Sequence, residues 1–168
     1  PLTIKADNGL VTVMSGRLTG YRELAELIVD EISHQLSVEK GLHFQKCSTH
    51  NLPLSGGDVG GSDAYVQFII DAIQRGITFN LSDIEAEELA TIYGANVDLL
   101  FEIAAKASPD EMQGLPILLY VKLMYGLLYE SVMTPNDFLI RRTGMLCFNI
   151  AEMKQYQPLI VKFMAKYF

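Results

Sequence analysis

Residues 115–133 form the most apolar part of the sequence, and they constrain the fold more than any other feature. The segment is about as long as a membrane-spanning helix, but it carries Lys122 near its middle and Glu130 near its end. A charged side chain in the middle of a bilayer is costly. We therefore interpret the segment as the buried central helix of a bundle, with a membrane span as the less favoured alternative.

Helical periodicity recurs on both sides of this segment. Apolar residues spaced three and four apart predict further helices, starting near Leu18, Ser62, Ser82, Asn96, Thr134, Phe148 and Pro158. Ser82 and Glu85 are spaced as a capping box, which marks the start of one helix. Gly76 is expected to end the helix before it.

The first fourteen residues have a different pattern. Two short alternating segments, residues 2–4 and 10–13, flank the turn sequence Asp7-Asn8-Gly9 and predict a β-hairpin. Two strands alone are marginally stable, so the rest of their sheet is expected elsewhere. The predicted fold class is all-α: a bundle of six to seven helices preceded by a short N-terminal β-hairpin.

The composition limits the classes of protein that the chain can belong to. Its 168 residues are 49% hydrophobic, which is enough for one sizeable core and excludes a disordered chain. A net charge of −7 without a basic run makes nucleic acid a poor partner. Cys47 and Cys147 form neither a disulfide framework nor a zinc motif. The start resembles no secretory leader and is not Met, so we expect a cytoplasmic protein and a piece of a longer chain.

Candidate catalytic residues are few. His34, His43 and His50 lack the spacing of metal ligands and are interpreted as surface or loop residues. The sequence has no GxSxG motif, so a serine hydrolase lacks its starting signal. We therefore assign no catalytic residue and no metal site.

Two other motifs have both a structural and a functional interpretation. Residues 55–62 contain four glycines and resemble a phosphate-binding loop, but no Lys-Ser/Thr follows and Asp58 would repel phosphate. A structural turn is the favoured interpretation.

Arg141 and Arg142 could bind an acidic partner or a phosphate. Because Asp137 lies four residues before Arg141, a structural ion pair is favoured there.

Residues 15–22, Ser-Gly-Arg-Leu-Thr-Gly-Tyr-Arg, predict a strand, a glycine turn and a helix. The N-terminus of a helix presents free N–H groups and a partial positive charge, which suits an electron-rich ligand atom. Arg17 in the turn would add a full charge. Such turns are common, so these residues alone favour a purely structural role.

The same segment resembles the Gly-Gly-Lys-Leu-Thr-x-Tyr-Arg junction of FAD-dependent glycerol-3-phosphate dehydrogenases and oxidases. Three more segments resemble that family in the same order. Residues 51–58 are similar to its leucine, proline and glycine loop, residues 93–97 to its Tyr-Gly-x-x-Val/Ala step, and residues 134–143 to its Thr-x-x-Asp-Phe-x-x-Arg-Arg-Thr segment. The chain thus resembles the C-terminal domain of alpha-glycerophosphate oxidase from about residue 10 to its end.

This resemblance implies an enzyme that oxidises sn-glycerol 3-phosphate to dihydroxyacetone phosphate with FAD. Residues 1–17 would be the last hairpin of the FAD-binding domain, and residues 18–168 would be the C-terminal helical domain. The N-terminal FAD and substrate domain of the same chain would be the main partner, because no GxGxxG after a first strand is present here. The fragment alone is expected to be inactive and not to hold FAD.

The resemblance also implies that Arg17, Leu18 and Thr19 lie near the flavin. Arg17 replaces the usual lysine of the family, so contact with the flavin, with the substrate phosphate or with neither stays open. The electron acceptor, quinone or oxygen, stays open too, as do a homo-oligomer and peripheral association with the inner face of the membrane. The alternative to the flavoenzyme is a free-standing helical protein-interaction module.

Overall fold

The computed structural model describes residues 2–168, and the chain divides into two compact units, Pro1–Pro53 and Leu54–Phe168. The first unit begins with the antiparallel strands β1 (Leu2–Lys5) and β2 (Val11–Met14), in which Thr3 pairs with Val13. The turn is closed by a hydrogen bond from the Gly9 amide to the Ala6 carbonyl, at a glycine with φ of +85°. The predicted hairpin is confirmed; its first strand is one residue longer than expected, and its second strand begins and ends one residue later.

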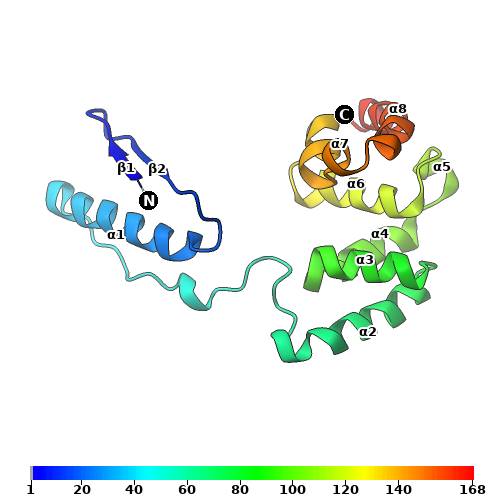
Figure 1. The fold of residues 1–168 in the computed structure, drawn as a ribbon, viewed down its shortest axis with the longest axis horizontal. Helices are drawn as coiled ribbons and strands as arrows, with labels where there is room; N and C mark the ends of the chain where they lie inside the picture. Colours follow the sequence, from blue (N-terminus) through cyan, green and yellow to red (C-terminus); the bar gives the residue numbers. More distant parts are fainter. Residues whose placement is uncertain (1) are drawn as a thin grey trace. The chain divides into compact units, whose positions relative to one another are not determined.

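A single long helix, α1 (Tyr21–Lys40), follows the hairpin (Figure 1). It begins three residues after Leu18 and ends at Gly41, whose φ of +65° terminates the helix in the left-handed conformation. Lys5 on β1 pairs with Glu31 on α1, so the hairpin lies along the helix. The chain then continues as an irregular connector that contains the short 3₁₀ helix η1 (Thr49–Asn51).

No residue of the first unit from 3 to 53 is buried. The hairpin and α1 therefore form no closed core of their own. The first compact unit contains α1 as well as the hairpin and ends at Pro53. The predicted domain boundary after residue 17 and the assignment of residues 1–17 to a FAD-binding domain both stay predictions.

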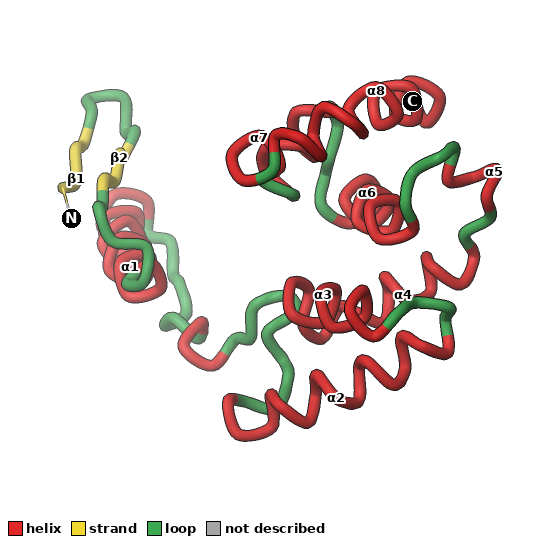
Figure 2. The backbone as a smooth tube through the Cα atoms, turned by 45° about the vertical axis from the view of Figure 1, so that its right-hand side comes forward, coloured by secondary structure: helices red, strands yellow, loops and turns green. Residues whose placement is uncertain are grey.

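All regular elements of the second unit are helices, joined by loops (Figure 2). Its elements are α2 (Ser62–Thr78), α3 (Asp83–Tyr93), η2 (Gly94–Asn96), α4 (Val97–Lys106), α5 (Pro109–Met112), α6 (Ile117–Tyr129), η3 (Asp137–Arg142), α7 (Met145–Phe148) and α8 (Ile150–Tyr167). The predicted fold class is confirmed. Residues 2–168 contain eight α-helices, more than the six to seven expected, because α5 and α7 are single turns of four residues.

The core of this unit lies around α6, as the apolar segment predicted. Phe101, Phe138, Leu89, Leu100 and Leu123 are among its fully buried side chains. Lys122 is only 14% exposed and pairs with Glu88 on α3, which compensates the cost of its burial. No helix within residues 2–168 is long and apolar enough to cross a bilayer.

The structure corrects two helix boundaries. Gly76 lies inside α2, where it allows close contact with α3: a Cβ atom there would lie 2.4 Å from the Cβ of Ala86. Pro158 lies inside α8 and does not begin a helix. Proline leaves the carbonyl of Lys154 without its helical donor, and water can replace that donor because both residues are exposed.

The helix predicted after Thr134 is a π-helix, η3. The predicted capping box of Ser82 and Glu85 is confirmed at the start of α3. Asn96 does not cap α4 with its side chain, which bonds instead to a loop far away in sequence.

Candidate functional site

The first candidate site is the turn between β2 and α1. Its last residue, Gly20, is the N-cap of α1 and has no side chain, so no side chain caps the first amide groups of the helix. Inside the turn the Arg17 amide donates to the Ser15 hydroxyl at 3.3 Å. The turn thus presents backbone N–H groups and the partial positive charge of a 20-residue helix.

Two cavities flank this turn, and they separate the three residues that the resemblance singled out. Arg17 and Leu18 line a cavity of about 600 Å³ whose wall is otherwise mostly apolar and includes Val13, Leu24 and Ile28. Thr19 lines a different cavity, of about 540 Å³, together with Gly20, Arg22, Glu23, Thr49 and His50. Arg17 and Leu18 are therefore brought together, and Thr19 faces the connector.

The histidines form no metal site with one another. His34 lies on α1, His43 in the connector and His50 in η1, and all three are exposed. Within residues 2–168 no group of three or more His, Cys, Asp or Glu side chains could hold a metal ion.

The glycine-rich loop of the second unit contacts another segment of the resemblance. The Ala95 amide donates to the Gly56 carbonyl at 2.9 Å, and the Asn96 side chain donates to the Ser55 hydroxyl at 2.8 Å. The approach is so close that a Cβ atom on Gly94 would lie 2.0 Å from the Gly56 oxygen. Gly56 thus serves a tertiary contact, in agreement with the structural interpretation of the loop.

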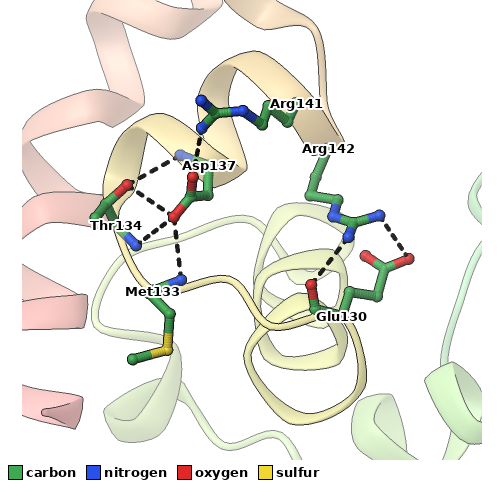
Figure 3. A network of polar contacts seen from close by, with 6 residues as sticks. All are labelled: Glu130, Met133, Thr134, Asp137, Arg141 and Arg142. Carbon is green, nitrogen blue, oxygen red and sulfur yellow. Dashed lines mark hydrogen bonds and ion pairs between the residues drawn. The ribbon is translucent and has the colours of Figure 1, made fainter. Parts of the chain in front are cut away.

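The last segment of the resemblance, residues 134–143, contains a polar network at the start of η3 (Figure 3). The Asp137 carboxylate accepts hydrogen bonds from the amide and the hydroxyl of Thr134, both at 2.8 Å, and the Thr134 hydroxyl accepts from the Asp137 amide at 3.3 Å. These bonds hold the pKa of Asp137 below its ordinary value. Arg141 pairs with Asp137, as its spacing predicted.

Arg142 points to a different partner, which the sequence did not reveal. Its Nη2 donates to the backbone carbonyl of Glu130 at 2.9 Å, and its Nη1 lies 3.4 Å from the carboxylate of the same residue (Figure 3). Both arginines of the pair therefore have structural partners.

These three segments meet around one polar cavity of about 270 Å³. Its lining residues are Ser55, Ile92, Tyr93, Asn96, Tyr125, Tyr129, Glu130 and Arg142. The rings of Tyr93 and Tyr125 meet edge to face, with centroids 5.0 Å apart. Burial raises the pKa values of both hydroxyl groups, so both are neutral hydrogen-bonding groups near pH 7. The arrangement joins the segments and provides no acid–base pair for catalysis.

The sequence did not reveal Ser55, Tyr93, Asn96 and Glu130 as one group, because no local pattern links residues so far apart. It also did not reveal the role of Arg22, whose guanidinium bonds to the connector. Its place in the Tyr-Arg step of the first segment was the one available signal.

The fold, the turn before α1 and the polar cavity of the second unit together define a class of protein. It is a helical domain with its own core that follows, in the same chain, a hairpin–helix unit without a core. The chain belongs to the family of the C-terminal domain of alpha-glycerophosphate oxidase, whose family model matches residues 47–168. The resemblance found from the four sequence segments is confirmed.

Relatives extend the similarity to nearly the whole chain. The chain is 45% identical over 159 residues to an aerobic glycerol-3-phosphate dehydrogenase of Staphylococcus haemolyticus, covering 95% of the chain and 28% of that relative. It is 42% identical over 161 residues to the enzyme of the same name from Staphylococcus epidermidis, covering 96% of the chain and 29% of the relative. The chain thus spans less than a third of the length of these relatives.

A solved structure gives the same result. The X-ray structure of the glycerol-3-phosphate dehydrogenase from Bacillus halodurans complexed with FAD matches with a TM-score of 0.88 and 36% identity. The match covers 99% of this chain and 33% of that chain, so it includes the hairpin and α1, which precede the part matched by the family model.

Proposed function

We propose that this chain is the C-terminal part of a FAD-dependent enzyme that oxidises sn-glycerol 3-phosphate to dihydroxyacetone phosphate. The observation that carries the proposal is the match of 99% of the chain, at 36% identity, to a glycerol-3-phosphate dehydrogenase complexed with FAD. The names of the Staphylococcus relatives support the same activity.

The donor groups of the first unit fit such a cofactor. The first amide groups of α1 have no side-chain cap, and Arg17 has no carboxylate within 4 Å among residues 2–168. When bound, FAD would supply the two-electron oxidising chemistry that the conversion of the substrate requires. The amides of the turn and the Arg17 guanidinium would stabilise the negative charge that develops during that oxidation.

The individual residues have different tasks in this proposal. Arg17 is fully charged at neutral pH and supplies long-range stabilisation of an anion. Leu18 is 87% exposed and is proposed to exclude water beside the cofactor once the rest of the protein covers it. Thr19, which lines the neighbouring cavity, is proposed to offer its hydroxyl as a hydrogen-bonding group.

The lack of a core in the first unit supports its association with a further domain. Ile4, Leu10, Leu27 and Val29 are each about half exposed, and α1 has no buried residue. Apolar surface of this extent is stabilised when another element covers it. We propose that the N-terminal FAD and substrate domain of the same chain covers this surface.

The helical unit has its own buried core and is not assigned a chemical step. The isolated fragment is accordingly proposed to be inactive and unable to retain FAD. We propose a cytoplasmic location for the enzyme, with peripheral docking at the inner face of the membrane as a further proposal.

The test is turnover by the full-length protein that contains this chain. Wild-type protein is expected to form dihydroxyacetone phosphate from sn-glycerol 3-phosphate. Arg17→Ala is expected to lower kcat/KM at least about tenfold, because a charge facing the reacting centre contributes at least about 1.4 kcal/mol in the transition state. Its melting temperature should stay close to that of the wild type, since Arg17 is exposed. Absence of turnover in the wild type would overturn the proposal, and unchanged kcat/KM in Arg17→Ala would remove Arg17 from the site.

A further inference from the structure

Arg22 connects two parts of the first unit that are far apart in sequence. Its Nη1 donates to the carbonyl of Thr49, and its Nη2 donates to the carbonyl of Leu52 at 2.6 Å. Thr49 begins η1 and Leu52 directly follows it, so one guanidinium group holds both ends of this short helix. Figure 1 shows how the chain turns back after α1 and brings η1 to this position.

The geometry requires arginine in particular. The guanidinium group is planar and donates to two acceptors at once from a rigid fork, whereas lysine is a point donor. Tyr21 also holds the guanidinium group in place. The Arg22 Nε donates to the Tyr21 hydroxyl at 3.3 Å, and the Arg22 Cζ lies 5.9 Å from the centre of the Tyr21 ring. No carboxylate lies within 4 Å of Arg22 among residues 2–168, so its charge is directed to the two carbonyls.

The connector has little else to hold it. Apart from Cys47, residues 41–53 are all exposed, and η1 has a single backbone bond of its own, from Leu52 to Thr49 at 3.2 Å. Arg22 also lines the cavity of about 540 Å³, together with Thr19, Gly20, Thr49 and His50. The bonds of Arg22 tie the connector to the first turn of α1, which directly follows Thr19 and Gly20.

We propose that Arg22 is a positioning residue: by fastening η1 to the first turn of α1, it keeps Arg17, Leu18 and Thr19 in the geometry that the oxidation needs. This inference rests on the function proposed above. Arg22 acts through the turn and touches no substrate. Its loss is expected to weaken stabilisation of the transition state more than binding of the ground state, and so to lower kcat more than it raises KM.

The experiment uses the full-length, FAD-containing protein with the substitutions Arg22→Ala and Arg22→Lys. Arg75→Lys is the matched control, because Arg75 donates to the exposed carboxylate of Asp98 at 3.0 Å on the helical unit. The first readout is the rate of limited cleavage by trypsin after Lys46, in the connector. The second is steady-state turnover of sn-glycerol 3-phosphate.

We expect Arg22→Ala to raise the cleavage rate about tenfold, the change that the loss of charge-assisted hydrogen bonds produces in a local opening equilibrium. We expect kcat to fall about tenfold with KM changed less than about twofold, since a small misplacement of a catalytic element has effects of this size. Arg22→Lys should lie between the wild type and Arg22→Ala in both readouts, and Arg75→Lys should match the wild type.

The two readouts separate the possible failures. Faster cleavage with unchanged kcat would show a purely structural tie and would overturn the positioning role. Unchanged cleavage in both Arg22 variants would overturn the tie itself, whatever the activity. If Arg22→Ala does not fold, Arg22→Lys decides both points. A wild-type protein that does not oxidise glycerol 3-phosphate would overturn the proposed function and the positioning role together, while the cleavage rates would still report on the tie.

Discussion

Replacing Gly94 by alanine should disrupt the junction of the glycine-rich loop with the end of α3. Gly94 has φ of +53° and ψ of −132°, a conformation that only glycine adopts readily. The new Cβ atom would also lie 2.0 Å from the Gly56 oxygen, so the loop would have to move away by more than 1 Å. That movement would break the bond from Ala95 to Gly56.

The free energy of unfolding should fall by about 3 kcal/mol. Backbone strain of this kind costs about 1–3 kcal/mol, and a lost backbone hydrogen bond costs about 1 kcal/mol. Urea denaturation of the 168-residue chain, followed by far-UV circular dichroism, measures the change as a lower midpoint at an unchanged slope.

Gly61→Ala is the matched control for strain without a clash. Gly61 has φ of +83°, but nothing lies within 4 Å of its would-be Cβ atom. Its cost should be backbone strain alone, at least about 1 kcal/mol less than that of Gly94→Ala. Equal costs for the two variants, or a Gly94→Ala change below about 0.5 kcal/mol, would show that the close approach of Gly94 to the Gly56 oxygen does not limit this position.

Three further predictions concern the helical unit. Gly76→Ala should cost about 1–3 kcal/mol by overpacking against Ala86, partly offset by helix propensity, and a stable variant in urea denaturation would contradict the close contact. Phe101→Ala removes a fully buried ring and should cost about 3–5 kcal/mol in the same measurement; a cost below about 1 kcal/mol would contradict the burial. Asp137 has a pKa lowered below 3.8, chiefly by its bonds to Thr134, so its stabilising contribution is complete above about pH 4 and is lost as pH falls through the folded-state value. Melting temperatures between about pH 2 and 6 should therefore vary less with pH in Asp137→Asn than in the wild type, and identical profiles would argue against the network.

Local signals in the sequence predicted local structure well. The hairpin turn at Asn8-Gly9 and the capping box of Ser82 and Glu85 depend on residues within a few positions of each other, and both are present. The apolar segment around Lys122 predicted the central helix, because the hydrophobicity of one continuous segment is also a local signal. The partner of Lys122, Glu88, lies 34 residues away and had no sequence signal.

Local rules failed where tertiary contacts decide the outcome. Gly76 was expected to end a helix, but it is a contact point between α2 and α3, and the packing there outweighs its low helix propensity. Pro158 was expected to begin a helix, but the buried side chains of α8 on both sides of it, Met153 and Ile160, hold one continuous helix together.

In the candidate site, too, the sequence predicted local motifs but not the tertiary contacts between them. The four segments of the resemblance could be read from the sequence, and the structure brings three of them together through Gly56, Tyr93 and Arg142. That meeting depends on contacts between residues tens of positions apart, which no spacing rule contains. The tie between Arg22 and the connector is of the same kind.

We propose that this chain completes a flavoenzyme that acts on glycerol 3-phosphate. The most direct measurement is the visible absorption of the full-length protein, titrated without oxygen with sn-glycerol 3-phosphate. We predict the absorption bands of oxidised flavin in the purified protein and their bleaching by this substrate, with one dihydroxyacetone phosphate formed for each flavin reduced. A protein without flavin, or a bound flavin that sn-glycerol 3-phosphate leaves oxidised, would contradict the claim.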